Sequence, residues 1–275
     1  MKSTKSLSLR IGMVLVGLNV LVALAAPMLA PDSPVTPNAL AVIQPPSGAH
    51  WLGTDSLGRD VLSRVLYGGR YAMLVSLVAT VLAVGIGAVL GCLAAYRRGW
   101  FDEILMRLLD SVLAIPAILA LLVVIAVLGA GAPVIVLAAT AVYCPAVIRV
   151  VRAAALNVVG LDYVTAARAR GERFWAIATR ELWPNILDVV MVEFAMRASW
   201  VLLLVSSLSF LGFGANPPTP DWGLMVSENR TLLTVAPMAT LGPIIALASL
   251  IVGLNLTADG FAKARGVDRM IAAAA

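Results

Sequence analysis

Long runs without charged residues alternate with short polar segments along this chain. Because about 20 apolar residues cross a bilayer as a helix, each run of that length is a candidate membrane span. The runs are too long and too uniformly apolar for barrel strands, which leaves helices as the spanning form. The predicted spans are 11–30, 71–96, two spans within 111–148, 186–211 and 231–258. The pattern therefore predicts an all-α membrane protein with six transmembrane helices.

The run 111–148 is too long for one helix. The sequence Gly-Ala-Gly-Ala-Pro at 129–133 divides it, so spans 3 and 4 are expected on either side. Pro116 and Pro145 are expected to kink these two spans, and the kinks could serve gating or packing.

The composition agrees with this class of protein. The chain has 275 residues, is 61% hydrophobic and 13% charged, and its mean hydropathy is +0.96. Charged residues make up about 25% of soluble proteins. The net charge of +5 does not indicate a nucleic-acid partner, because the basic residues lie in short segments beside the apolar runs. Cys92 and Cys144 lie within apolar runs and are interpreted as small hydrophobic residues.

The distribution of basic residues predicts the orientation, since lysine and arginine concentrate on the cytoplasmic side. A cytoplasmic N-terminus leaves only Arg59, Arg64, Arg70 and Arg230 outside. The residues then predicted to be cytoplasmic are Lys2, Lys5, Arg10, Arg97, Arg98, Arg107, Arg149, Arg152, Arg168, Arg170, Arg173, Arg180, Lys263, Arg265 and Arg269. Both termini are expected in the cytoplasm. The first run exceeds the 7–15 apolar residues typical of a signal peptide, so a retained helix is expected.

The polar loop at 162–171 is expected to contain a short helix whose surface carries mostly small side chains. Asp162 can cap its N-terminus, alanines occupy 166, 167 and 169, and Gly171 can end it in the left-handed conformation. About two turns, roughly 12 Å, would result. Such a helix can dock closely in a groove of another protein, although an ordinary loop between membrane helices is the alternative.

This loop resembles the cytoplasmic coupling loop, the EAA loop, of ATP-driven importer permeases. The shared features are the small-small-x-x-x-Gly core and a Leu-x-Pro about a dozen residues later, while the leading Glu of the motif is Thr165 here. The resemblance assigns coupling to an ATPase to Thr165, Ala166, Ala167, Arg168, Ala169, Gly171, Leu182 and Pro184.

Further blocks resemble the second permease of dipeptide, oligopeptide and nickel importers of the ATP-binding cassette (ABC) type. They are His-Trp-Leu-Gly-Thr-Asp-Ser-Leu-Gly-Arg-Asp-Val-Leu-Ser-Arg at 50–64, Ser-Leu-Ser-Phe-Leu-Gly-Phe-Gly at 207–214, Pro-Pro-Thr-Pro-Asp-Trp-Gly at 217–223 and, more weakly, Asp259-Gly260. The resemblance covers residues 7–269. It implies the type I ABC importer permease fold and a second permease, two cytoplasmic ATPases and an extracytoplasmic solute-binding protein as partners.

The expected cargo is a di- or oligopeptide, with nickel, glutathione or another small solute as alternatives within the family. A secondary transporter that needs no ATPase is the alternative from another class, and it should show an internal inverted repeat, which is not visible here. The expected segments are an N-terminal helix (1–31), an extracytoplasmic connector (32–70), a five-helix core (71–258) containing the coupling loop (160–184), and a cytoplasmic tail (259–275).

Several kinds of chemistry are not expected in this chain. The sequence has no Gly-x-x-x-x-Gly-Lys-Ser/Thr phosphate loop and no hydrolase or metalloprotease signature. A non-catalytic subunit without a cofactor is therefore predicted, with ATP and Mg²⁺ bound by partner ATPases. His50 is the only histidine, and a lone loop histidine does not predict a metal site. Arg59 could bind helix-end carbonyls or a carboxylate, and a structural role is favoured over substrate contact.

Two charges within a predicted span are candidates for a further site. Glu193 and Arg197 are four residues apart and share one helix face, and Arg197 lies roughly 18 Å past Asn185 along the helix. A charge at that depth normally faces a bundle interior or water. The pair could line a pathway for charged substrate, or neutralise itself and pack the subunit. Arg107 and Asp110, at the start of span 3, are expected to snorkel or to be paired.

Overall fold

The computed structural model describes residues 2–266, and within this range it is helical without a regular strand. Arg269 and the rest of the tail lie outside the described residues. The elements are α1 (Lys2–Leu29), η1 (Ala39–Ala41), α2 (Val61–Arg97), α3 (Gly99–Leu113), α4 (Ala117–Leu128), α5 (Ala132–Val159), α6 (Asp162–Ala169), α7 (Phe174–Ile177), η2 (Ala178–Leu182), α8 (Trp183–Phe210), α9 (Trp222–Asn229), η3 (Arg230–Leu232) and α10 (Pro237–Arg265).

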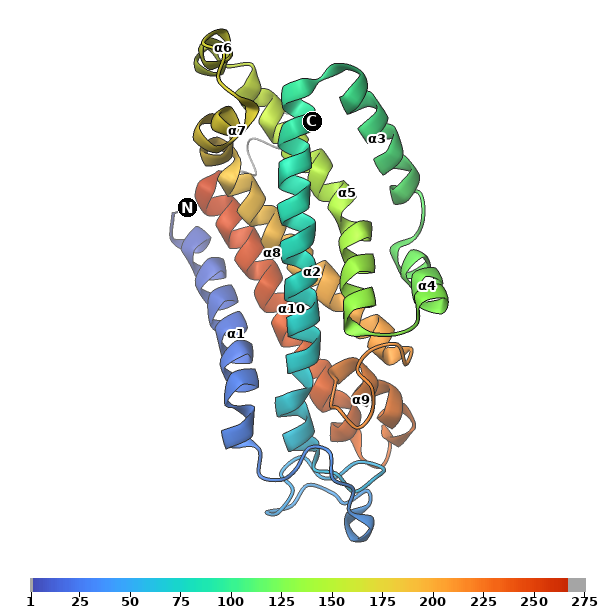
Figure 1. The fold of residues 1–275 in the computed structure, drawn as a ribbon. Coiled ribbons are helices and arrows are strands. Elements are labelled where there is room, and N and C mark those ends of the chain that lie inside the picture. Colours follow the sequence, from blue (N-terminus) through green and yellow to red (C-terminus); the bar gives the residue numbers. More distant parts are fainter. Residues whose placement is uncertain (1, 267–275) are drawn as a thin grey trace.

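The long helices form a bundle with shorter segments at its two ends (Figure 1). The short helices α6 and α7 lie at one end, which we call the α6 end. Helix α9 and the connector between α1 and α2 lie at the opposite end, which we call the α9 end. Helix α2 runs between the two ends, so it joins these segments directly.

The prediction of an all-α membrane protein is confirmed. Five helical segments are long and apolar enough to span a membrane: Leu7–Leu29, Val61–Arg97, Ala132–Val159, Phe174–Phe210 and Pro237–Arg265. The sixth span differs from the prediction, because α3 and α4 are bent by 85° at a short break. Pro116 lies in the break, has no N–H to donate and disfavours helical conformation in the residue before it. Helix α5 continues through Pro145.

Two helices extend beyond the predicted spans. Helix α2 begins at Val61, within the predicted connector, because Asp60 caps it by accepting a 2.7 Å hydrogen bond from the Ser63 N–H. At the other terminus, α10 continues to Arg265, beyond the predicted end at residue 258.

Small residues bring α2 close to α5. A Cβ atom at Gly91 would lie 2.9 Å from the Ile148 carbonyl oxygen, so the two backbones could not approach as they do with a larger residue there. Lipid provides no hydrophobic driving force between helices, and close van der Waals contact takes its place. On the opposite side of the bundle, Asn19 of α1 donates a 3.0 Å hydrogen bond to Ser249 of α10.

Ion pairs hold α3 against α5. Arg152 is hydrogen-bonded to Asp102 through two nitrogens, and Arg149 pairs with Asp110. Arg107 pairs with Glu103 on the exposed side of α3 at 2.5 Å. Asp110 and Arg107 are therefore both paired, one of the two arrangements expected for them.

Candidate functional site

The two ends of α6 are formed in different ways. Its C-terminus closes with Gly171 at φ +77°, as predicted, while the Glu172 N–H bonds the Ala167 carbonyl and the Gly171 N–H bonds the Arg168 carbonyl. This Schellman arrangement satisfies carbonyls that the helix end leaves free. The predicted N-terminal cap is wrong: Leu161 occupies the cap position without a side-chain bond, and Asp162 lies in the first turn, where its charge favours the helix dipole.

The two faces of α6 have different roles. Val164 and Ala167 are fully buried in a hydrophobic cluster that also includes residues of α2, α5 and α8. Thr165, Ala166 and Ala169 are exposed. Ala167 therefore fixes α6 to the bundle, and the face available to a partner is the small-residue face of the other three.

A stack of side chains connects α6 to the end of α2. The Arg168 guanidinium lies 4.0 Å from the centre of the Tyr96 ring, and Arg168 also donates a 3.0 Å hydrogen bond to the Tyr96 carbonyl. Tyr96 in turn contacts Phe174 of α7, with 5.1 Å between ring centres. The sequence analysis missed Tyr96, because it closes an apolar run and only the fold brings it to Arg168.

The segment after α6 is continuous with α8. Helix α7, the π-helical turn η2 and α8 form one apolar helical segment, Phe174–Phe210. Ile177 and Leu182 are buried in the same cluster as Val164, whereas Pro184 is exposed at the start of α8. Helix α6 is therefore packed in one cluster with residues of both α2 and α8.

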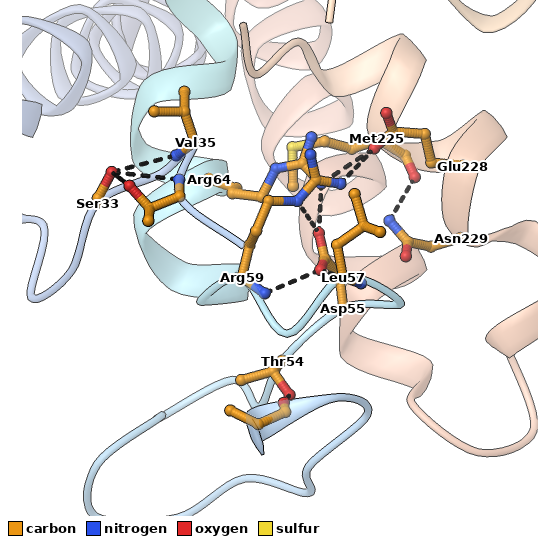
Figure 2. A network of polar contacts seen from close by, with 12 residues as sticks. Ser33, Val35, Thr54, Asp55, Leu57, Arg59, Arg64, Met225, Glu228 and Asn229 are labelled. Carbon is orange, nitrogen blue, oxygen red and sulfur yellow. Dashed lines mark hydrogen bonds and ion pairs between the residues drawn. The ribbon is translucent and has the colours of Figure 1, made fainter. Parts of the chain in front are cut away.

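At the α9 end, four charged residues form one network (Figure 2). Arg59 donates from Nε to Asp55 at 2.8 Å and from Nη2 to Glu228 at 3.0 Å. Arg64 contacts the same two carboxylates through Nη1, at 2.5 Å and 3.0 Å. Asp55, Arg59 and Arg64 are almost completely buried. Of the partners expected for Arg59, the structure shows carboxylates.

Electrostatics keep the Asp55 carboxylate charged in this network. Burial, the largest influence, raises its pKa, but the N–H groups of Arg59 and Leu57 and the two guanidiniums together lower the pKa below its usual value. Asp221 caps α9 by accepting a 3.1 Å hydrogen bond from the Leu224 N–H, and its pKa is shifted in the opposite direction. Burial raises the pKa of Asp221 despite N–H groups donated by Leu224 and Gly223.

The network joins the two sequence blocks that carry the family resemblance. Glu228 belongs to α9, which begins at Trp222 within the block at 217–223, whereas Asp55, Arg59 and Arg64 belong to the block at 50–64. The buried Trp222 adds a second connection by donating its indole N–H to the Val65 carbonyl at 2.9 Å. The start of α2 and helix α9 are therefore held together as one unit.

The Glu193–Arg197 pair is formed within α8. Arg197 Nε lies 2.9 Å from Glu193 Oε2, Glu193 is buried, and the Arg197 side chain is 17% exposed. Nearby, Ser199 donates a 2.9 Å hydrogen bond to Asn255 of α10. The geometry provides the internal neutralisation that one interpretation requires.

Comparison with known proteins identifies the family. Residues 87–265 match the family described as "binding-protein-dependent transport system inner membrane component". The chain belongs to this family. It is a transmembrane permease subunit of an ABC importer and a bacterial inner-membrane protein.

Individual relatives are similar over most of their length. A glutathione transport system permease of Pectobacterium atrosepticum is 39% identical over 80% of this chain and 73% of its own length. A putative peptide transport system permease of Brucella suis is 39% identical over 92% and 85%, respectively. A dipeptide transport system permease of Haemophilus influenzae is 35% identical over 92% and 88%.

The network at the α9 end predicts a hierarchy of stability losses. Asp55→Asn leaves two buried guanidiniums with only Glu228, so we expect a loss of about 3–5 kcal/mol in the free energy of unfolding. Glu228→Gln should cost less, because Glu228 is partly exposed and Asp55 still contacts both arginines. Thermal unfolding of the purified protein in detergent measures both. Equal losses in the two variants would contradict this network.

The lowered pKa of Asp55 also predicts how stability depends on pH. Because the pKa of Asp55 is lower in the folded than in the unfolded chain, its charged carboxylate stabilises the folded state. This stabilisation is complete above the pKa of the unfolded chain, about 3.9, and is lost as the pH falls through the pKa of the folded chain. Unfolding scans from pH 7 downward should show this acid loss in the native protein and a reduced loss in Asp55→Asn. If Asp55→Asn lost as much stability at low pH as the native protein does, the result would contradict a charged Asp55.

The Glu193–Arg197 pair predicts a double-mutant result. Arg197→Met leaves a buried carboxylate uncompensated and should reduce the yield of folded protein, and adding Glu193→Gln should restore it. Folded yield and transport are measured for both single variants and the double variant. Normal yield in all three, with transport lost whenever Arg197 is absent, would favour contact with substrate over neutralisation.

Proposed function

We propose that this permease imports di- or oligopeptides as part of a complex with a second permease, two cytoplasmic ATPases and an extracytoplasmic solute-binding protein. The observation that carries the proposal is α6, a short helix whose exposed side includes Thr165, Ala166 and Ala169, with the exposed Tyr163 at its edge, and whose buried side packs on the bundle. Such a surface fits a cleft in an ATPase. Relatives named for peptide and dipeptide transport support the cargo.

Glutathione is the second candidate cargo. A relative named as a glutathione transport permease supports it directly. Glutathione and short peptides share peptide bonds and terminal carboxylates, so the permease alone does not separate them. A binding assay on the solute-binding protein, with a dipeptide and glutathione in parallel, decides between the two.

The contacts of α6 suggest how ATP binding changes the pathway. When the ATPases close, α6 moves as a rigid body, and the Arg168–Tyr96 stack passes the movement to α2. The buried contacts of Ile177 and Leu182 pass it to α8. Both helices lead to the α9 end, where the Asp55–Arg59–Arg64–Glu228 network can respond. Alternating access then follows from two packed states that the nucleotide stabilises differently.

The orientation in this proposal places the α6 end in the cytoplasm. Arg97, Arg98, Arg168, Arg170 and Arg173 lie in or beside the segments at that end. At the α9 end, Arg59 and Arg64 are both neutralised by carboxylates. This asymmetry agrees with the concentration of basic residues on the cytoplasmic side.

The assembly is tested by purifying the tagged chain from its native host. The expected result is copurification of two ATPases and a second permease, and ATP-dependent peptide uptake by proteoliposomes of that complex. Ala166→Glu should detach the ATPases, because it adds bulk and charge to the exposed face of α6. Ala39→Glu, the same change at an exposed residue of the α9 end, is the control. ATPase retention with Ala166→Glu would contradict this docking face.

The end of α6 gives a sharper test of coupling. Gly171→Ala places a Cβ in a left-handed conformation at a cost of about 1 kcal/mol or more, although the space around it is open. Gly160→Ala is the matched control, since Gly160 has a negative φ of −80°. We expect reduced ATP-driven uptake only for Gly171→Ala, with recovery in Gly171→Asn, because asparagine tolerates this conformation. Equal uptake in both alanine variants would reject the coupling assignment.

The orientation is tested by labelling of single cysteines. Cysteine at the exposed Ala49 of the connector should react with an impermeant thiol reagent added to intact spheroplasts. Cysteine at the exposed Arg173 should react only after permeabilisation. Cys92 and Cys144 are buried and provide little background. The reverse labelling pattern would overturn the orientation.

A further inference from the structure

The fold brings three potential metal ligands together at the α9 end. The His50 Nδ1 atom lies 3.0 Å from Asp60 Oδ1 and 3.6 Å from Asp32 Oδ2. One ligand atom from each of the three residues lies within 4.8 Å of the other two. Asp32 precedes His50 by 18 residues and Asp60 follows it by 10, and the folded connector brings both carboxylates to the histidine.

The three side chains are positioned by the surrounding backbone. The Asp32 N–H donates a 3.1 Å hydrogen bond to Ser63 Oγ of α2, and the His50 N–H donates one of 3.1 Å to Ser47 Oγ. Asp60 is buried and uses Oδ2 to cap α2, which leaves Oδ1 directed at His50. The ligand set therefore joins the residues after α1, the connector and the first turn of α2.

An accessible cavity adjoins this cluster. It has a volume of about 340 Å³ and is lined by the three residues together with polar groups of Ser33, Thr36 and Asn38. The Asp32 side chain is 53% exposed, so a hydrated ion can reach the cluster. Among the described residues, no lysine or arginine pairs with Asp32 or Asp60, in contrast to Asp55 with its two arginines.

We propose that Asp32, His50 and Asp60 bind a divalent transition-metal ion, with zinc the ion that best fits the donors. Zinc takes imidazole nitrogen and carboxylate oxygen at about 2.0–2.2 Å, which in a tetrahedral site separates ligand atoms by about 3.4 Å. The observed separations of 3.0 and 3.6 Å from His50 bracket this value. Three protein ligands leave a fourth position for a water molecule facing the cavity. The ion fastens the connector to the start of α2, and this role is independent of the cargo.

The site is tested on the purified full-length chain after removal of metal with a chelator. Co²⁺ serves as the spectroscopic probe, because low-coordinate Co²⁺ absorbs visible light, and Zn²⁺ is added to displace it. We expect one saturable Co²⁺ site per chain, displaced by Zn²⁺. His50→Gln and Asp32→Asn should each weaken binding at least tenfold. Asp259→Asn, at a carboxylate of the opposite end, should leave it unchanged.

A second measurement separates metal binding from folding. Zn²⁺ should slow proteolysis of the connector in the native chain and in Asp259→Asn, and should have no effect in Asp32→Asn. Asp32 is largely exposed and its backbone contact to Ser63 is retained, so that variant is expected to fold. Absence of saturable Co²⁺ binding, or binding unchanged by His50→Gln, would overturn the proposal. The cluster would then consist only of polar contacts between His50 and the two carboxylates.

Discussion

The lack of water in the membrane interior is the constraint on which the rest of this structure depends. Every backbone N–H and C=O within the hydrocarbon must be paired inside its own segment, which allows only helices here. Lipid also offers no hydrophobic driving force between helices, so they associate through close contact of small residues, as at Gly91 of α2 against α5. Charged chemistry is consequently confined to the ends of the bundle, with Glu193 and Arg197 as a paired exception.

Helix α2 connects the two ends of the bundle. It has 37 residues, which corresponds to about 55 Å of helix. Arg64, in its first turns, belongs to the charged network with α9, and Tyr96, next to its last residue, belongs to the stack with Arg168. The same helix therefore takes part in the contacts at both ends of the bundle.

The two ends use charge differently. At the α9 end, Asp55, Arg59 and Arg64 are buried and each guanidinium contacts both Asp55 and Glu228, which makes the contact between α2 and α9 specific in geometry and costly to break. At the α6 end, the exposed side of α6 includes the small residues Thr165, Ala166 and Ala169, and Tyr163 and Arg168 are exposed beside them. The first arrangement suits a joint within one subunit, and the second suits a surface that docks against another protein.

The sequence by itself determined the class of protein, the approximate positions of the spans, the family and the small helix ended by Gly171. These features are local, since hydrophobic run length, glycine conformation and motif spacing act within short stretches of chain. Only the tertiary structure decided which face of α6 is free, that Tyr96 receives Arg168, that Glu228 completes the network of Arg59 and Arg64, and that Asp32 and Asp60 meet His50. Most of these depend on contacts between segments far apart in the chain, and the His50–Asp60 contact depends on how the connector folds back. Such contacts are fixed by how the helices pack, and neither residue of a pair carries a local signal of its partner.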